Sequence, residues 1–456
     1  MHTMPLDRTP RKARLTPVLA ALGGVVIGLI ASTGLVAAAS IALILSAILS
    51  DTRAHGQEVK VGVVVPYTGV GAQNARQIDR GLDLYLKLNA EKVKPYAIKL
   101  IKRDAKDLGG ANARVAVQEL LTQDNVDILT GWYDSPSAIA SAPVVTAGKK
   151  LAVILNAGTA HITNLSPYYV RVSFSNWHAG FSMGQAAVTM LQAKTAVVGY
   201  TDFAGGRDSL AAFKHGFAAH SASEDARKRA YGASEDARKP AYGGTVIDEI
   251  PMGGAAAVPD FTPFFQRAKD KKPDVFYVFV PAGNFAVTAI KTYHALGMRA
   301  AGIKLIGPGE ISQDSKLQAM GEAAVGLITT YHYNADLANA ENQRFVAAWK
   351  HEYGADAVPD FFAVGGYDGM AAIVRAIHAT NGKSDPDKAI AALRGWKHAS
   401  PRGPIMIDPF TRDVVMNEYL SEVAMLDGRL QQNVIGTFER VRDPCKKLRI
   451  GPCRTD

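Results

Sequence analysis

Cysteine is scarce in this chain, and several short motifs that carry common catalytic chemistry are missing. Its 456 residues include only two cysteines, Cys445 and Cys453. There is no Cys-x-x-Cys pair, no His-Glu-x-x-His zinc motif and no glycine-rich phosphate loop ending in Lys-Ser/Thr. Because no nucleophile or acid–base pair is placed by its neighbours, we expect no enzyme, no metal and no cofactor.

The two cysteines lie in a polar C-terminal tail, residues 441–456. In an oxidising compartment they would close one small disulfide loop. The alternative is a pair of unpaired surface thiols. We expect the disulfide, because exposed free thiols are a liability outside the cell.

A concentration of positive charge is also missing. The formal net charge is +9, of which residues 1–56 contribute +3 through five Lys and Arg residues against two Asp. The remainder is dispersed, and no Lys/Arg-rich block with interleaved aromatic residues occurs. Nucleic acid is therefore not an expected partner.

The N-terminal region is a membrane signal. Residues 15–50 contain no charged side chain, and Arg11, Lys12 and Arg14 precede them. The basic side should stay in the cytoplasm, so everything after it is exported. Small residues before Gln57 suit signal cleavage, but the apolar run exceeds the roughly 7 to 15 residues of a signal core. Residues 1–56 are thus a signal peptide or an uncleaved N-terminal anchor that tethers a periplasmic body.

Short apolar segments alternate with amphipathic segments of about a dozen residues from Val59 onward. Strand-like runs include 59–65, 97–101, 126–130 and 151–155, and the alternation restarts with 196–200, 245–250, 275–280 and 304–306. This pattern predicts an α/β fold with two doubly wound parallel-sheet lobes. Parallel sheets bind ligands beyond the carboxyl ends of their strands, so two facing lobes would enclose a small-molecule cleft.

The segment 131–140, GWYDSPSAIA, predicts a strand that runs into a helix. Ser135 before Pro136 is typical of a helix N-terminus. Free amides together with the hydroxyls of Ser135 and Ser137 would suit a carboxylate there. From this stretch alone, Ser135 is either only a helix cap or a ligand contact.

A tandem copy interrupts the second lobe. ASEDARKRAYG at 222–232 is followed by ASEDARKPAYG at 233–243, and the copies differ only at Arg229 and Pro240. A charged, glycine-bounded duplication predicts an insertion in a surface loop, and a docking epitope is the alternative.

Nine blocks, in order, resemble one family. They are VKVGVVVPYTG, GWYDSPSA, LNAGTA, YVRVSFSN, TDFAGGRD, FVPAGN, IGPGEIS, AVGGYDGM and SPRGPIMIDPFTRD. The chain resembles periplasmic substrate-binding proteins of ABC importers, in the leucine/isoleucine/valine-binding (branched-chain amino acid) class, over nearly all of residues 58–440. The resemblance implies a type I fold with lobes at 57–175 plus 331–402 and at 176–330 plus 403–440. It also implies three crossovers, near 171–176, 329–334 and 400–404, about which the lobes close.

The resemblance also implies a ligand site. Ser135 and Thr159 fall where the class holds a ligand carboxylate, and the Ala157 carbonyl falls where it meets an ammonium. Glu310 lies one position later than the class's acidic residue, and 282–284 lack its aromatic residue. The expected ligand contacts are Ser135, Ser137, Ala157, Gly158, Thr159, Phe203, Ala282, Gly283, Asn284 and Glu310.

The expected function is the extracytoplasmic solute-binding component of an ABC importer, which captures an amino acid or related small carboxylate. Its partners would be that ligand and an ABC permease in the inner membrane. One alternative is a membrane-anchored ligand sensor, and another is a binder of amides, urea or aromatic acids. An anchored sensor would need a cytoplasmic signalling domain, for which residues 1–14 are too short.

Overall fold

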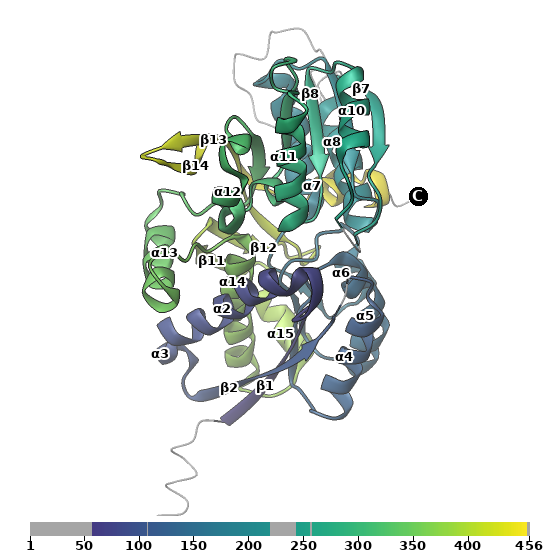
Figure 1. Ribbon diagram of the computed structural model, residues 1–456. Helices are drawn as coiled ribbons and strands as arrows, with labels where there is room; N and C mark the ends of the chain where they lie inside the picture. Colours follow the sequence, from purple (N-terminus) through teal and green to yellow (C-terminus); the bar gives the residue numbers. More distant parts are fainter. Residues whose placement is uncertain (1–56, 107, 219–242, 256–257, 454–456) are drawn as a thin grey trace, which may run out of the picture. The chain divides into compact units, whose positions relative to one another are not determined.

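The computed structural model describes residues 57–106, 108–218, 243–255 and 258–453 (Figure 1). The predicted membrane segment, the cleavage site before Gln57 and all of the duplication except Gly243 lie outside these residues. None of the described helices is both long and apolar enough to cross a bilayer.

Five parallel strands form the first sheet in the order β2-β1-β3-β4-β5. They are β1 (Gln57–Val65), β2 (Tyr96–Asp104), β3 (Ile128–Gly131), β4 (Ala152–Ile154) and β5 (Tyr169–Arg171). Thr130 of β3 pairs with Val63 of β1 and with Val153 of β4. The loops that follow these three strands therefore emerge side by side at one edge of the sheet.

Helices cover both faces of the first sheet. They are α2 (Ala72–Leu88), α3 (Ala90–Val93), α4 (Ala111–Thr122), α5 (Ser135–Gly148) and α6 (Ile162–Leu165), preceded by the 3-10 turn η1 (Gly69–Gly71). Three more come from far along the chain, α13 (Ala340–Tyr353), α14 (Phe361–Thr380) and α15 (Pro386–Leu393). The crossovers of a parallel sheet must run over its faces, which is why helices separate its strands.

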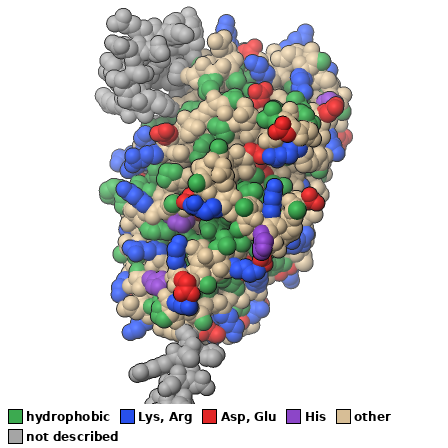
Figure 2. Space-filling model, turned by 90° about the vertical axis from the view of Figure 1, so that its left-hand side faces the viewer, with side chains coloured by type: hydrophobic (Ala, Val, Ile, Leu, Met, Phe, Trp, Pro, Cys, Tyr) green, Lys and Arg blue, Asp and Glu red, His purple; other side chains and the backbone are tan. Residues whose placement is uncertain are grey.

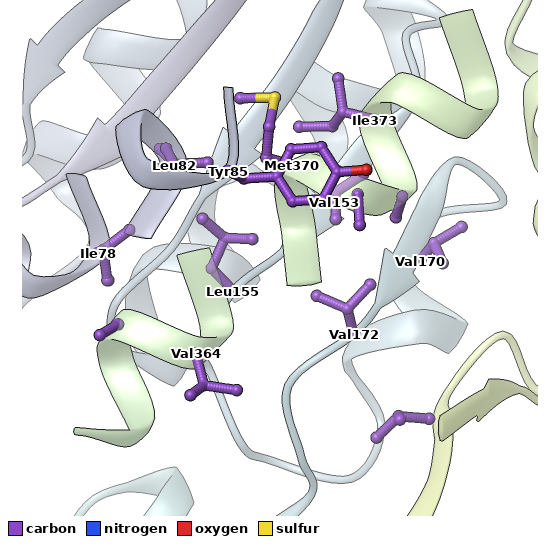
Figure 3. Close-up of a cluster of buried hydrophobic side chains, with 14 of the residues drawn as sticks. Ile78, Leu82, Tyr85, Val153, Leu155, Val170, Val172, Val364, Met370 and Ile373 are labelled. Carbon is purple, nitrogen blue, oxygen red and sulfur yellow. The ribbon is translucent and has the colours of Figure 1, made fainter. Parts of the chain in front are cut away.

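The core of this lobe lies between the sheet, α2 and α14. Leu82 and Tyr85 of α2 meet Met370 and Ile373 of α14 above Val153 of β4 (Figure 3). The two helices approach closely because glycine stands at their contact. A Cβ atom on Gly81 would lie 2.1 Å from the Ala363 carbonyl oxygen, and one on Gly366 would lie 2.2 Å from that of Ile78. A larger residue at either position would separate the helices.

Nine strands form the second sheet, in the order β11-β12-β13-β10-β9-β8-β6-β7, with β14 paired to β13. They are β6 (Thr195–Tyr200), β7 (Thr245–Pro251), β8 (Val275–Phe279), β9 (Lys304–Pro308), β10 (Ile328–Tyr331), β11 (Lys397–Ser400), β12 (Gly403–Ile407), β13 (Val414–Leu426) and β14 (Arg429–Val441). Strands β6 to β10 pair in parallel, whereas β11 to β14 add antiparallel pairs. The predicted α/β class with two parallel-sheet lobes is confirmed.

The helices of the second lobe are α7 (Asn176–Thr189), α8 (Ala204–Ala218), α10 (Thr262–Asp270), α11 (Asn284–Ala295) and α12 (Asp314–Met320), with 3-10 turns η4 (Gly309–Ser312) and η5 (Gly321–Ala324). One core packs α10, α11 and α12 on the sheet, and the other packs α7 and α8. Each lobe thus buries a hydrophobic core of its own.

The chain passes between the lobes three times. β5 of the first sheet leads into α7 of the second lobe, and β10 of the second sheet leads to α13 and α14 on the first core. The segment 400–404, expected to be the third crossover, instead forms the turn between β11 and β12. Strand β13 forms the third crossover between the lobes, because Val414 and Met416 pack in the first core while Val423 packs in the second.

The C-terminal segment is more buried than its polar sequence suggested. It folds into α16 (Pro444–Leu448) and the 3-10 turn η6 (Gly451–Cys453), and the expected disulfide joins Cys445 to Cys453. Both cysteines pack with Trp177 of α7, so the disulfide belongs to a small hydrophobic cluster and not to a loose tail.

Buried charges hold the same segment to the first crossover. The Arg171 guanidinium lies 2.7 Å from a carboxylate oxygen of Asp413, and the Lys446 ammonium lies 2.5 Å from the other. Burial alone would raise the pKa of Asp413, but Arg171 and Lys446 hold it below its ordinary value. Burial and the neighbouring Asp413 raise the pKa of Asp443 to about 6. The segment therefore braces the crossover.

Surface charge is mixed on the face drawn in Figure 2. Lys and Arg side chains are scattered among acidic, polar and hydrophobic ones and do not gather in a single patch. That distribution lacks the basic stripe expected where a protein contacts nucleic acid.

Candidate ligand-binding site

The stretch 131–140 folds as a strand and a helix, but another residue caps the helix. β3 ends at Gly131, and α5 begins at Ser135. Asp134 is the N-cap, with extended backbone and a carboxylate that accepts from the Ser137 amide at 2.9 Å and from the Ser137 hydroxyl at 2.7 Å. The interpretation of Ser135 as the cap is therefore wrong by one position, because Ser135 already lies within the helix.

This cap changes what the helix terminus offers to a ligand. The Asp134 carboxylate occupies the Ser137 amide and places negative charge at the terminus, which weakens its attraction for an anion. Ser135 does not cap the helix, and it lines the cavity instead. Its hydroxyl oxygen accepts from the Thr159 amide at 3.1 Å, and a hydroxyl that accepts one bond can still donate another.

A cavity of about 510 Å³ opens at the carboxyl ends of strands from both sheets. Such volumes are typical of small-molecule sites. It is lined by Gly69, Val70, Lys106, Leu108, Gly109, Tyr133, Asp134, Ser135, Pro136, Asn156, Gly158, Phe174, Asn176, Phe203, Ala255, Phe279, Pro281, Ala282, Glu310, Phe361 and Phe362.

Aromatic side chains form much of the cavity wall. They are Tyr133, Phe174, Phe203, Phe279, Phe361 and Phe362. The Tyr133 ring stacks on the Phe362 ring, with centroids 5.2 Å apart and planes inclined by 17°. The ring centroids of Phe203 and Phe279 lie 5.9 Å apart. Flat apolar surfaces of this kind favour a planar ring, which can stack or meet their edges.

Polar groups in the cavity are few, and several are already engaged. The Asn156 amide donates to the Tyr133 carbonyl oxygen at 2.5 Å, and the Asn176 amide donates to that of Gly205 at 3.0 Å. Among the described residues that line the cavity, Lys106 is the basic one. The Ser135 hydroxyl and the Lys106 ammonium are therefore candidate partners for a ligand anion.

Glu310 enters the cavity from the second lobe. It follows β9 in the turn η4, its side chain is 6% exposed, and its Oε2 atom has no hydrogen-bond partner among the described residues. Burial raises the pKa of Glu310 to about 7, partly offset by hydrogen bonding from its own backbone amide and the Tyr331 side chain. The carboxyl is therefore part neutral and part ionised near pH 7.

Five of the ten expected contacts line the cavity, and five do not. Those that do are Ser135, Gly158, Phe203, Ala282 and Glu310. Those outside the lining are Ser137, Ala157, Thr159, Gly283 and Asn284. The Ser137 hydroxyl is bound to Asp134, and Asn284, the first residue of α11, is exposed.

The Ala157 carbonyl, which the resemblance implies would meet an ammonium, faces a cation instead, as does the Thr159 carbonyl. The Arg171 guanidinium donates to the Thr159 carbonyl oxygen at 2.7 Å and to the Ala157 carbonyl oxygen at 3.4 Å. Their lone pairs are therefore directed at a buried positive charge, which would repel an ammonium. The implied role of Ala157 does not fit this arrangement.

Thr159 bridges the lobes. Its hydroxyl donates to a carboxylate oxygen of Asp208 on α8 at 2.5 Å, and the Ala160 amide donates to the same oxygen at 2.7 Å. Thr159 and Ala160 follow β4 of the first sheet, whereas Asp208 belongs to the second lobe. These hydrogen bonds therefore hold the lobes together beside Ser135, which lines the cavity.

A second bridge lies on another side of the cavity. The Gln313 side-chain amide donates to Asn74 of α2 at 2.9 Å and to Asp360, the N-cap of α14, at 2.6 Å. The Ser315 hydroxyl donates to the same Asp360 oxygen at 2.6 Å. The lobes are thus connected by buried hydrogen bonds at two places.

One serine pattern in the sequence matches a catalytic motif by spacing alone. Gly180–Gly184 reads Gly-Phe-Ser-Met-Gly, which matches the spacing of a hydrolase nucleophile motif. In that motif the serine stands exposed on a strand-to-helix turn. Here Ser182 is buried within α7, so the pattern has a packing role.

Comparison with known proteins decides the family. The family described as periplasmic binding protein matches residues 58–240 and 222–427. The chain belongs to the periplasmic binding protein family. The two matched stretches overlap at 222–240, within the tandem copy, as expected if one copy is an insertion.

Relatives of this periplasmic binding protein are similar over most of its length. A Leu/Ile/Val-binding protein homolog 6 of Brucella melitensis is 35% identical over 397 residues, which cover 87% of this chain and 95% of that protein. A solute-binding protein of an ABC transporter from Rhodopseudomonas palustris BisB5, in complex with 3,4-dihydroxy benzoic acid, is 39% identical with a TM-score of 0.77, over 85% of this chain and 99% of that chain.

Two further structures extend the comparison. A solute-binding protein from R. palustris HaA2, in complex with p-hydroxybenzoic acid, is 33% identical with a TM-score of 0.76, over 85% of this chain and 98% of that chain. A leucine-binding protein from Thermotoga maritima, at 20% identity and a TM-score of 0.68 over 84% of this chain and 99% of that chain, shows the shared fold. The chain is a solute-binding protein of an ABC transporter with the type I fold.

Proposed function

We propose that this solute-binding protein captures an aromatic carboxylate in the periplasm and delivers it to an ABC permease. The observation that carries the proposal is the aromatic wall of the cavity. Six aromatic side chains from both lobes surround a space of about 510 Å³, which suits a flat ring enclosed from both sides.

The polar groups support an anionic ligand. Ser135 has a hydroxyl to donate, and the Lys106 ammonium contributes positive charge on the first-lobe side. A hydrogen bond to a charged group is worth about 1.5 to 3 kcal/mol, so these two contacts would fix the carboxylate end of the ligand. The ring would then extend toward the aromatic residues.

The comparisons favour the same ligand class. Two structures more than 30% identical to this chain hold dihydroxy- or hydroxybenzoic acid. What they bind is a property of those proteins. It supports an aromatic acid here because this cavity has an aromatic wall of its own.

An amino acid is the second candidate. Glu310 would face its ammonium, and the curated relatives are named as Leu/Ile/Val-binding homologs. Against it, the Ala157 carbonyl expected to assist the ammonium faces Arg171. We therefore rank the aromatic acid first.

The lobes would close over the ligand. We propose lobes at 57–175 with 331–416 and at 176–330 with 423–440, joined by the crossovers, of which β13 is the third. Support comes from the separate hydrophobic cores and from the bridges at Asp208 and Gln313. The exported location and an anchor or signal at residues 1–56 remain proposals that rest on the charge-free run ahead of Gln57.

The test is a ligand panel against residues 57–456, which form one compact unit. Calorimetry and melting temperature would compare benzoate with benzamide, which lacks the charge, and with L-leucine. We expect benzoate to bind and to raise the melting temperature, with benzamide at least tenfold weaker. Tight binding of leucine without any response to benzoate would replace the proposal by the amino-acid alternative.

A further inference from the structure

Glu310 is the cavity's unexplained polar group. It projects from the turn after β9, on the second lobe, whereas Ser135 and Lys106 belong to the first. The side chain is almost fully buried, and its Oε2 atom has no hydrogen-bond partner among the described residues. A buried carboxyl oxygen without a partner is rare in folded proteins and calls for an explanation.

The surroundings of Glu310 offer acids and phenols but no cation. A hydrogen bond from the Tyr331 side chain lowers the pKa of Glu310. The charge of Glu310 in turn raises the pKa values of Tyr133, Tyr277 and Glu418. No Lys or Arg among the described residues offsets the burial of its carboxyl. The group is therefore not half of a structural ion pair, and it borders the cavity.

An aromatic carboxylate has one anchored end and one free end. If the carboxylate lies at Ser135 and Lys106, electrostatic repulsion keeps it away from Glu310, and the ring's far edge points toward the second lobe. That edge would meet the buried Glu310 among aromatic residues. A polar substituent on the ring would supply the partner that the Oε2 atom of Glu310 lacks.

Resting on the proposed function, we propose that Glu310 selects aromatic carboxylates that carry a ring hydroxyl, through a hydrogen bond between that hydroxyl and the Glu310 carboxyl. With Glu310 ionised, the phenolic O–H donates to a carboxylate oxygen. With Glu310 neutral, its own O–H donates to the phenolic oxygen. Both forms are satisfied by a hydroxyl, and neither is satisfied by a C–H or C–F bond.

The selectivity should be large because the penalty for an unpaired buried carboxyl oxygen applies only to a ligand that lacks the ring hydroxyl. An unsubstituted ring leaves the buried Oε2 atom of Glu310 without a partner, and sites built to read a hydroxyl discriminate strongly against analogues that lack it. We expect 4-hydroxybenzoate or 3-hydroxybenzoate to bind about 10- to 100-fold more tightly than benzoate.

Calorimetry with the wild-type protein tests this directly. The probes are benzoate, its 3- and 4-hydroxy derivatives, and 4-fluorobenzoate, which fills similar space without a hydroxyl. A preference of tenfold or more for either hydroxy acid over both benzoate and 4-fluorobenzoate supports the inference. Equal affinities overturn it, yet leave the proposed function intact, since all four acids would still bind. Binding of none of the four would instead refute the proposed function.

Variants assign the preference to Glu310. In Glu310→Leu, the ratio of the benzoate to hydroxybenzoate dissociation constants should fall toward one, and a general loss of affinity cancels in that ratio. Glu310→Gln keeps the shape of the side chain and one acceptor, so the ratio of dissociation constants should be intermediate. If the leucine variant does not fold, the glutamine variant serves as the test of whether Glu310 reads the hydroxyl. A ratio that stays at the wild-type value in the folded variant would show that another group reads the hydroxyl.

Discussion

Replacing Asp208 by alanine should weaken ligand binding about 10- to 100-fold. One oxygen of this carboxylate accepts from the Thr159 hydroxyl at 2.5 Å and from the Ala160 amide at 2.7 Å. The two donors and the acceptor belong to different lobes, so these hydrogen bonds form only when the lobes are close together. Hydrogen bonds to a charged group contribute about 1.5 to 3 kcal/mol, and that free energy would be lost from the ligand-bound, closed state.

The variant separates closure from folding. Binding of a ligand that needs closed lobes includes the cost of closure, so removal of a closed-state contact raises the dissociation constant. The melting temperature of the unliganded protein should change little, because these contacts of Asp208 join the two lobes and would be absent when the lobes are apart. Asp208→Asn should have a smaller effect, since an amide oxygen can still accept from both donors but without the charge.

Calorimetric titration with the best ligand of the benzoate panel is the assay, and Asp202→Ala is the matched control. Asp202 also lies on the second lobe, but it pairs with Arg207 on the surface at 2.7 Å, where an ion pair contributes little. A dissociation constant for Asp208→Ala within threefold of wild type would refute the argument. An equal loss of unliganded stability would make Asp208 a static joint between the lobes and not a closure contact.

Three further predictions concern the site and the C-terminal segment. Ser135→Ala should weaken benzoate binding about tenfold or more by titration, and it should also lower the unliganded melting temperature, because the buried Thr159 amide loses its acceptor. Glu310 has a folded-state pKa of about 7 against an ordinary 4.5. The folded state then binds more protons in this range, so the free energy of unfolding should fall by roughly 3 kcal/mol between pH 4.5 and 7 relative to its change in Glu310→Gln, measured by urea unfolding at each pH. Replacing Cys445 and Cys453 by serine opens a short loop and should lower the free energy of unfolding by about 2.5 kcal/mol, with loss of the difference under reducing conditions as the check.

Much of the fold could be predicted because it depends on local pattern. Short apolar strands and amphipathic helices alternate along the chain, and that alternation alone requires parallel sheets with helices on both faces. The third crossover could not be placed in this way. Its position depends on which core accepts each part of β13, and a single extended strand that enters two cores gives no break in its sequence pattern.

The sequence predicts where the site lies along the chain better than it predicts which side chains line it. Ser135 and Glu310 follow strand ends and do line the cavity. Phe361 and Phe362 were missed because they lie on α14, which returns to the first lobe far along the chain, and no local signal marks them as cavity residues. The helix cap was misplaced because Asp134 and Ser135 are both good caps, and only backbone conformation distinguishes them.

Thr159 lies outside the cavity lining, and we expect it to affect binding through its neighbours. Its backbone amide donates to the Ser135 hydroxyl oxygen at 3.1 Å, and its hydroxyl donates to Asp208 across the lobes. A ligand that recruits the Ser135 hydroxyl therefore acts on a residue whose other bond holds the closed arrangement. Thr159→Val should reproduce part of the loss seen in Asp208→Ala, and the double variant should be no worse than Asp208→Ala by more than about half a kcal/mol if the two residues act through one contact. Additive losses of affinity in that double-mutant cycle would mean that Thr159 meets the ligand after all, as the family resemblance implies.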